Sequence, residues 1–182
     1  MSPRPFVVAL LGAESTGKTT LARQIADALR ADGDTAVVVD EALREFCTAQ
    51  ARTPRREEQQ AIAEEQTRRI DAAAATKVNV VVADTTALMV AVYSDFVFGD
   101  TALYEAAEAA QRRIDLTLLT ALDLPWQADG LQRDGAHVRG PVDALVRAGL
   151  ERAGVSPVTV AGIGPARLAA ALAAIRQRRR AA

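Results

Sequence analysis

The chain has 182 residues, of which 49% are hydrophobic and 25% are charged, and its formal net charge is −1. This length corresponds to about one domain, and a net charge near zero excludes a polycation that binds nucleic acid. The single cysteine, Cys47, excludes an internal disulfide and a multi-cysteine metal site. No segment has the pattern of a secretory leader or the ~20 apolar residues of a membrane span, so we expect a cytoplasmic protein with neither a nucleic-acid nor a membrane partner.

Apolar patterning predicts the elements in chain order. Residues 6–11 (FVVALL) form a continuous apolar run, which is typical of a strand buried on both faces. Residues 18–31 place apolar side chains on one helical face, and the β-branched run at 36–39 (AVVV) predicts a second strand. The remaining predicted elements are a helix to about 51, a helix at 54–75, a strand at 78–83, helical material to about 113, a strand at 115–120, a helix at 141–153, a strand at 157–160 and a helix at 165–178.

The long helix has a clear start signal. Thr53 is expected to be its N-cap, Pro54 its first helical residue, and two glutamates follow in the first turn. In contrast, residues 121–140 carry one proline and three glycines, too many helix and strand breakers for regular structure. This stretch predicts a surface loop or lid, which we place at about 124–141.

Residues 12–20, GAESTGKTT, directly follow the first strand and contain the spacing Gly-x4-Gly-Lys-Thr of a phosphate-binding loop. Its glycines, Gly12 and Gly17, allow successive backbone N–H groups to turn inward, and the helix that begins near Lys18 adds its N-terminal dipole. Lys18 would reach the β- and γ-phosphates of a nucleotide, and the Thr19 hydroxyl would bind Mg²⁺. The residues expected to hold the nucleotide are Gly12, Ala13, Glu14, Ser15, Thr16, Gly17, Lys18, Thr19 and Thr20.

Strands that alternate with helices of ten or more residues indicate a parallel sheet covered on both faces. The prediction is therefore an α/β fold of three layers, a P-loop NTPase fold with a five-stranded parallel sheet. We expect one domain over residues 1–182, with the lid described above and a basic tail at 177–182. The tail fits the solvated end of a helix, with contact to RNA or anionic lipid as the alternative.

A phosphate loop predicts nucleotide binding without specifying the reaction. A GTPase would carry Asn-Lys-x-Asp after a late strand, and the corresponding stretch at 120–123 (TALD) lacks the lysine. A hydrolytic motor would end its third strand with Asp-Glu, whereas this strand is followed by Asp84-Thr85. The absence of a glutamate that activates water favours transfer of the phosphoryl group to another acceptor.

Kinases of this fold need a carboxylate near the acceptor hydroxyl, a carboxylate near the metal, and arginines that neutralise the transferred phosphoryl group. Asp40 and Glu41 follow the second strand, and Asp84 follows the third, at the sheet edge where ligands bind. Arg133 and Arg139 lie in the predicted lid. The alternatives are that the carboxylates only cap helices and that the arginines are solvated loop charges.

Several stretches together resemble the ribosylnicotinamide kinase domain of NadR-type proteins, a NadR-like AAA domain family. The order of these stretches also agrees with the family over about residues 6–176. The matching stretches are GAESTGKTTLA at 12–22, Glu41-x-x-Arg44-Glu45, IAEEQ at 62–66, Asp84-Thr85, and LDLPW-x-x-DG at 122–130.

The resemblance implies a P-loop kinase that binds MgATP and phosphorylates the 5′-hydroxyl of nicotinamide riboside. It implies that Thr19 and Asp84 serve the metal, that Asp84 or Glu41 takes the proton, and that the lid arginines clamp phosphates. The residues then expected to contact the nucleoside-like substrate are Asp40, Glu41, Arg44, Trp126 and Asp129. Trp126 is interpreted either as a packing anchor or as a ring that stacks on the ligand.

The chain departs from the family at the acceptor site. The family commonly has a tryptophan before the E-x-x-R stretch and a tyrosine after its glutamate, and the chain has Asp40 and Ala42 there. An aromatic face would benefit a cationic nicotinamide ring. The alternative function is therefore a nucleotide-binding regulatory module that does not phosphorylate an acceptor. The acceptor, the oligomeric state and the choice between Glu41 and Asp84 as base remain open at this point.

Overall fold

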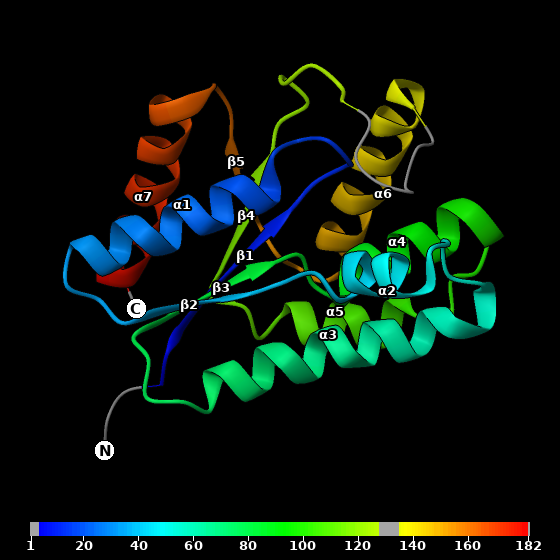
Figure 1. Ribbon diagram of the computed structural model, residues 1–182, viewed down its shortest axis with the longest axis horizontal. Coiled ribbons are helices and arrows are strands. Elements are labelled where there is room, and N and C mark those ends of the chain that lie inside the picture. The colour runs from blue at the N-terminus through cyan, green and yellow to red at the C-terminus, as the bar shows by residue number, and fades with distance from the viewer. Residues whose placement is uncertain (1–3, 128–134, 182) are drawn as a thin grey trace.

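Five strands form one parallel sheet in the computed structural model, which describes residues 4–127 and 135–181. In spatial order across the sheet they are β2 (Ala36–Val39), β3 (Val80–Asp84), β1 (Phe6–Leu11), β4 (Leu116–Thr120) and β5 (Val158–Val160). Neighbouring strands are parallel throughout, so the carboxyl ends of β1, β2 and β3 meet at one edge (Figure 1). This arrangement confirms the predicted fold.

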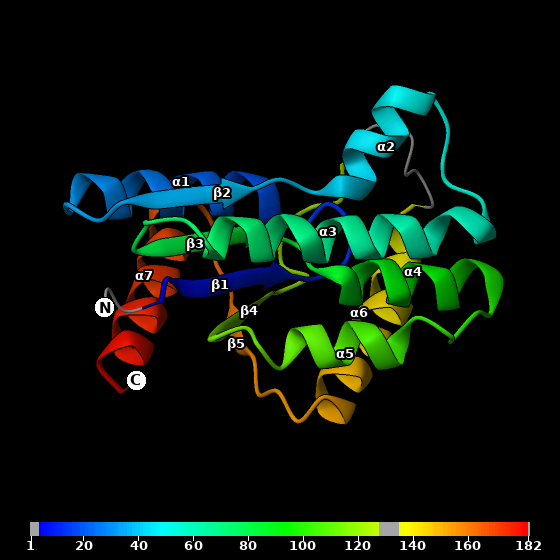
Figure 2. The same cartoon turned by 90° about the horizontal axis from the view of Figure 1, so that it is seen from below.

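Helices cover both faces of the sheet (Figure 2). The first and last helices pack against one face, and the remaining helices lie over the other. The helices are α1 (Lys18–Ala31), α2 (Ala42–Gln50), α3 (Gln59–Ala74), α4 (Ala87–Phe98), α5 (Tyr104–Gln111), α6 (Arg139–Arg152) and α7 (Gly164–Ala181), and short 3₁₀ turns precede α3 at Arg56–Glu58 and α6 at Ala136–Val138. Among these described elements, no helix is long and apolar enough to cross a membrane.

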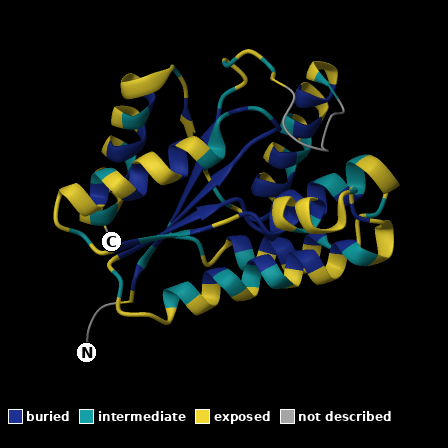
Figure 3. Cartoon of the chain, viewed as in Figure 1, coloured by how far each residue is buried: buried dark blue, intermediate teal, exposed yellow. Residues whose placement is uncertain are grey.

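The core follows from the alternation of side chains along the central strand. Val8 and Leu10 of β1 pack with α1 and α7, whereas Val7 and Ala9 face the opposite side. The central strands β1, β3 and β4 are accordingly almost entirely dark blue in Figure 3, whereas much of the exposed surface comes from the outer faces of the helices and from the loops. Burial of each large apolar side chain contributes about 1.5–3 kcal/mol, so the central strand is held firmly from both sides.

The start of the long helix differs from the prediction. Thr53 is not its N-cap, since α3 begins at Gln59 after the 3₁₀ turn. The Glu58 carboxylate accepts a hydrogen bond from the Arg55 N–H at 2.7 Å and pairs with the Arg52 guanidinium at 2.6 Å. These contacts hold the chain in a turn before the helix, which outweighs the local preference of Thr-Pro for a helix start.

The two predicted irregular segments are partly ordered. The helix α6 begins at Arg139 rather than at 141, so the last part of the predicted lid is helical, and residues 128–134 lie outside the described residues. In the basic tail, Arg179 pairs with Asp34 at 2.6 Å, and Arg178 donates to the Asp115 carbonyl. These contacts favour the interpretation of the tail as the end of α7.

Candidate active site

The phosphate loop between β1 and α1 is shaped by residues with positive φ angles. Gly12 has φ 146° and Gly17 has φ 75°, and Ser15 adopts φ 54° although it is not glycine. A Cβ atom at Gly12 would overlap the Thr120 hydroxyl on β4. Glycine is therefore required at this position both by the backbone angle and by the close approach of β4.

Threonine hydroxyls fasten the loop to the sheet. Thr16 is fully buried, and its Oγ1 donates to the Ala13 carbonyl at 2.8 Å and lies 2.7 Å from Oγ1 of Thr120. The Thr120 hydroxyl in turn donates to the Leu11 carbonyl at 3.1 Å. The side chain of Thr16 is thus occupied by contacts within the protein.

Lys18, Thr19 and Asp84 meet at the carboxyl edge of the sheet. The half-buried Lys18 donates from Nζ to the Ala13 carbonyl at 2.8 Å, across the mouth of the phosphate loop. The Thr19 hydroxyl donates to Oδ2 of Asp84 at 2.5 Å. Asp84 is 1% exposed, and its Oδ1 atom is buried without a hydrogen-bond partner in the described structure.

Glu41 brings a second buried carboxylate to the same edge. It is 8% exposed, and its Oε2 lies 3.4 Å from Nε of Arg44 one turn further along α2. The Glu41 side chain makes no capping hydrogen bond at the N-terminus of α2. Asp40, in contrast, lies at the surface 3.7 Å from Arg23, away from these groups.

Burial shifts the pKa values of the two central charged groups, Glu41 and Lys18. Burial raises the pKa of the Glu41 carboxyl, opposed by the positive charge of Lys18 and reinforced by the negative charge of Asp84. Burial likewise lowers the pKa of the Lys18 ammonium, and the charges of Glu41 and Asp84 work against this shift. The site therefore holds a carboxyl and an ammonium whose charges depend on each other.

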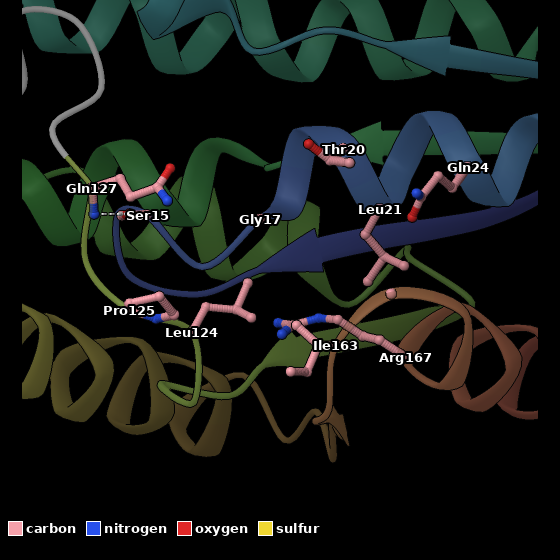
Figure 4. A pocket seen from close by; sticks show the side chains of 11 residues that line it. Ser15, Gly17, Thr20, Leu21, Gln24, Leu124, Pro125, Gln127, Ile163 and Arg167 are labelled. Atoms are coloured by element: carbon pink, nitrogen blue, oxygen red, sulfur yellow. Dashed lines mark hydrogen bonds between the residues drawn. The ribbon is translucent and has the colours of Figure 1, made fainter.

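A cavity of about 540 Å³ opens on one side of the phosphate loop (Figure 4). Leu124 and Pro125 from the segment after β4 face Ile163 and Arg167 across it. Thr20, Leu21 and Gln24 of α1 form another wall. Its size and its position beside the N-terminus of α1 suit the nucleoside of a bound nucleotide.

A second, much smaller cavity of about 20 Å³ lies on the other side of the loop. It is lined by Glu14, Ser15, Lys18, Glu41, Arg44, Met89, Tyr93 and Gln127. Ser15 and Gln127 line both cavities, and the Gln127 N–H donates to the Ser15 hydroxyl at 2.8 Å, as the dashed line in Figure 4 shows. This contact forms a wall between the two cavities.

The lid residues are placed as follows. Arg139 is buried, and its Nη1 donates a hydrogen bond to the Leu124 carbonyl at 2.8 Å. Its Nε and Nη2 have no hydrogen-bond partner among the described residues, and the residue lines neither of the two cavities. Trp126 is half-buried, and its indole nitrogen is enclosed without a partner in that part of the chain. Arg133 and Asp129 lie outside the described residues.

Sequence reasoning missed several residues that build the site. Arg167 at the start of α7 donates to the Thr16 carbonyl at 2.9 Å and pairs with Asp123 at 3.1 Å, so it braces the phosphate loop. Tyr93 and Met89 from α4 line the small cavity. Neither α7 nor α4 carries a motif at these positions, and their role follows only from the tertiary arrangement.

The raised pKa of Glu41 leads to a testable result. A carboxyl whose pKa is higher in the folded than in the unfolded state stabilises the protein fully below pH about 4.5, and this contribution is lost as pH rises through the folded-state value. Glu41→Gln should therefore raise the melting temperature relative to wild type at pH 7 to 8, and the difference should shrink toward pH 4.5. Thermal unfolding across this pH range measures it, with Glu105→Gln on the exposed side of α5 as control. A difference that does not change with pH would contradict the expectation.

A glycine-rich loop between β1 and α1, with the Asp84 carboxylate at the end of the neighbouring strand, defines a P-loop nucleotide-binding domain. The model of the AAA domain family matches residues 7–167. The chain belongs to this family. No curated protein sequence shows significant similarity to it.

Solved structures share the fold. A NadR protein in complex with NR superposes with a TM-score of 0.79 at 20% identity, over 96% of this chain and 50% of that chain. A NadR protein in complex with NAD and AMP-PNP gives 0.76 at 19% identity, over 96% and 49%. A thymidylate kinase from Ehrlichia chaffeensis gives 0.65 at 12% identity, over 96% and 99%. The chain spans about half the length of the two NadR chains.

Proposed function

We propose that the chain is an ATP-dependent small-molecule kinase that transfers the γ-phosphoryl group of MgATP to a nucleoside-like hydroxyl. The observation that carries this proposal is the position of Lys18 near two buried carboxylates, with a cavity on each side of the phosphate loop. We call the nucleoside-sized cavity beside α1 the donor cavity, and the small polar cavity lined by Glu41 and Tyr93 the acceptor cavity. A donor and an acceptor on opposite sides of the loop would meet at the Lys18 ammonium.

The phosphate loop would hold and polarise the donor. Its inward N–H groups and the N-terminus of α1 favour the β- and γ-phosphates. Lys18 would leave the Ala13 carbonyl for these phosphates and stabilise the charge that develops during transfer. The lid arginines would clamp the phosphates; Arg139, the one within the described residues, donates to the Leu124 carbonyl outside both cavities and would have to leave this contact to do so.

The residues near Thr19 fit a magnesium ion. Oδ1 of Asp84 is buried with no hydrogen-bond partner in the described part, and its other oxygen already contacts the Thr19 hydroxyl. Hydroxyl and carboxylate oxygens are the ligands that Mg²⁺ prefers, usually one or two carboxylates together with substrate phosphates. When bound, magnesium would supply positive charge that neutralises the phosphate oxygens and so favours attack of the acceptor hydroxyl on the γ-phosphorus. Thr19 and Asp84 are the residues that would hold it.

Two carboxylates compete for the proton of the acceptor hydroxyl. Glu41 lines the acceptor cavity and has a raised pKa, which brings it closer to the range of an effective base. Asp84 lies at the same edge and would be occupied in part by the metal. The proton would pass to Glu41 if Asp84 holds the magnesium, and to Asp84 otherwise. Arg44 would orient Glu41 through their contact.

Nicotinamide riboside is the first acceptor to test. The family resemblance and the NadR structure in complex with NR support it. Tyr93 of α4 supplies an aromatic ring to the acceptor cavity, where positions 40 and 42 lack one, and Glu14 and Glu41 add carboxylates. An aromatic face beside negative charge favours a cationic ring.

The test is a panel of nucleosides, with nicotinamide riboside included, incubated with MgATP and analysed for phosphorylated product by mass spectrometry. We expect one acceptor to be converted with stoichiometric release of ADP. The proposal would be abandoned if no nucleoside of the panel accelerates ATP consumption.

One observation favours a second candidate function, a regulatory module that binds ATP or ADP without an acceptor. The acceptor cavity encloses only about 20 Å³, the room of about one water molecule. Tight nucleotide binding by calorimetry, together with no product from the whole panel, would favour the regulatory module over the kinase.

A further inference from the structure

Gln66 of α3 connects two backbone segments that lead out of the candidate active site. Its side chain is 1% exposed. Oε1 accepts a hydrogen bond from the Ala42 N–H at 2.7 Å, and Nε2 donates to the Thr85 carbonyl at 3.4 Å. Ala42 directly follows Glu41, and Thr85 directly follows Asp84. One buried amide thus touches the residue after each of the two carboxylates.

The start of α2 and the backbone at Thr85 both depend on hydrogen bonds from other parts of the chain. The first N–H groups of a helix have no partner within it, and α2 has no side-chain cap of its own, so Gln66 supplies the cap from another helix. Thr85 has φ 73°, a costly angle for a β-branched residue that persists only where the surroundings hold it. The Thr85 carbonyl bond to Gln66 contributes to this restraint.

The docking of α2 on α3 has other supports. Arg69 of α3 pairs with Glu45 of α2 at 2.7 Å at the surface. Ile62 and Ala63 of α3 pack in the same apolar cluster as Leu43. Gln66 is therefore not required merely to keep the helices together, and its two bonds are directed at the catalytic edge.

We propose that Gln66 is a positioning residue that fixes the spacing of Glu41 and Asp84 around Lys18. This inference rests on the proposed kinase function for its effect on turnover, but the geometry it describes exists without substrate. Loss of the amide would free the first turn of α2 and the backbone after β3 at the same time. Glu41 would then move outward relative to Asp84, and displacements of about 1 Å at a reacting centre can cost about 100-fold in rate.

The test compares Gln66→Leu with Gln111→Leu. Gln111 of α5 is a glutamine as deeply buried as Gln66, and its side-chain amide forms hydrogen bonds with the hydroxyls of Thr86 and Thr117. Its replacement therefore removes a similar number of hydrogen bonds but none that involve α2. We expect kcat to fall about 10- to 100-fold in Gln66→Leu, with the KM for ATP within about twofold of wild type, because the donor cavity lies on the other side of the loop. Gln111→Leu should lower thermal stability with a much smaller change in kcat.

A second measurement does not need activity. Carbon-13 NMR of the glutamate carboxyls, assigned with the Glu41→Gln spectrum, follows the titration of Glu41 in each variant. In Gln66→Leu the pKa of Glu41 should move down toward its ordinary value, since the carboxyl becomes more solvated; in Gln111→Leu it should stay where it is in wild type.

The outcomes separate the two proposals. An unchanged Glu41 titration in Gln66→Leu, with a stability loss like that of Gln111→Leu, would overturn the positioning role. A shifted titration in a protein that phosphorylates no acceptor would support the positioning role and reject the kinase function. A shifted titration with reduced kcat in an active kinase would support both.

Discussion

Replacement of Lys18 with alanine is expected to lower phosphoryl transfer by at least about 100-fold while leaving the melting temperature unchanged or slightly higher. The side chain would supply positive charge where negative charge develops in the transition state, and removal of one such donor typically costs about 10²–10³ in kcat. In the folded protein its Nζ donates to one backbone carbonyl, and burial lowers its pKa. Its charge is therefore held at some cost to folding.

The chain contains one other lysine, Lys77, which is exposed at the far end of the sheet from the phosphate loop. Lys77→Ala is therefore the matched control and should retain the activity of wild type. Turnover is measured with the acceptor found in the panel, and stability by thermal unfolding. Parallel losses of activity and stability in Lys18→Ala would mean that the residue serves the fold rather than the reaction.

Asp84→Asn is expected to lower turnover about 100- to 1000-fold and to abolish the gain in nucleotide affinity that magnesium provides. Asparagine has nearly the same shape, and its Oδ1 can still accept the hydrogen bond of the Thr19 hydroxyl, so the fold should be retained. What is lost is the negative charge that would hold a divalent cation. Calorimetric titration of ATP with and without Mg²⁺ measures the effect.

Thr19→Ser is the control for this experiment, because it keeps the hydroxyl beside Asp84. It should bind MgATP within a few-fold of wild type. Should Asp84→Asn keep the full dependence of ATP affinity on magnesium, Asp84 is not the metal carboxylate. Its role would then be reassigned to the acceptor side.

The parts of the site that sequence predicts are those where local pattern and strand order are sufficient. The phosphate loop is contiguous, and its glycines are required by their φ angles. Asp84 and Thr19 are 65 residues apart, yet their contact could be anticipated because parallel strands bring their carboxyl ends to one edge. The alternation of strands and helices likewise predicted the sheet that is observed.

Other features depend on contacts between distant segments. Arg167 reaches the Thr16 carbonyl across 151 residues, and nothing near either residue signals the pairing. Asp40 and Glu41 are neighbours in sequence with the same charge, but Glu41, the residue directly before α2, is buried, while Asp40 faces Arg23 at the surface. A pattern of residue types does not distinguish the two.

The path of the chain through the sheet bears on how the protein is made on the ribosome. The central strand β1 is synthesised before its neighbours β3 and β4, which emerge some seventy and a hundred residues later. The brace that Arg167 places on the phosphate loop comes later still. The phosphate loop is thus synthesised well before the segments that fix its final shape, so a nucleotide would find its complete site only after Arg167 has emerged.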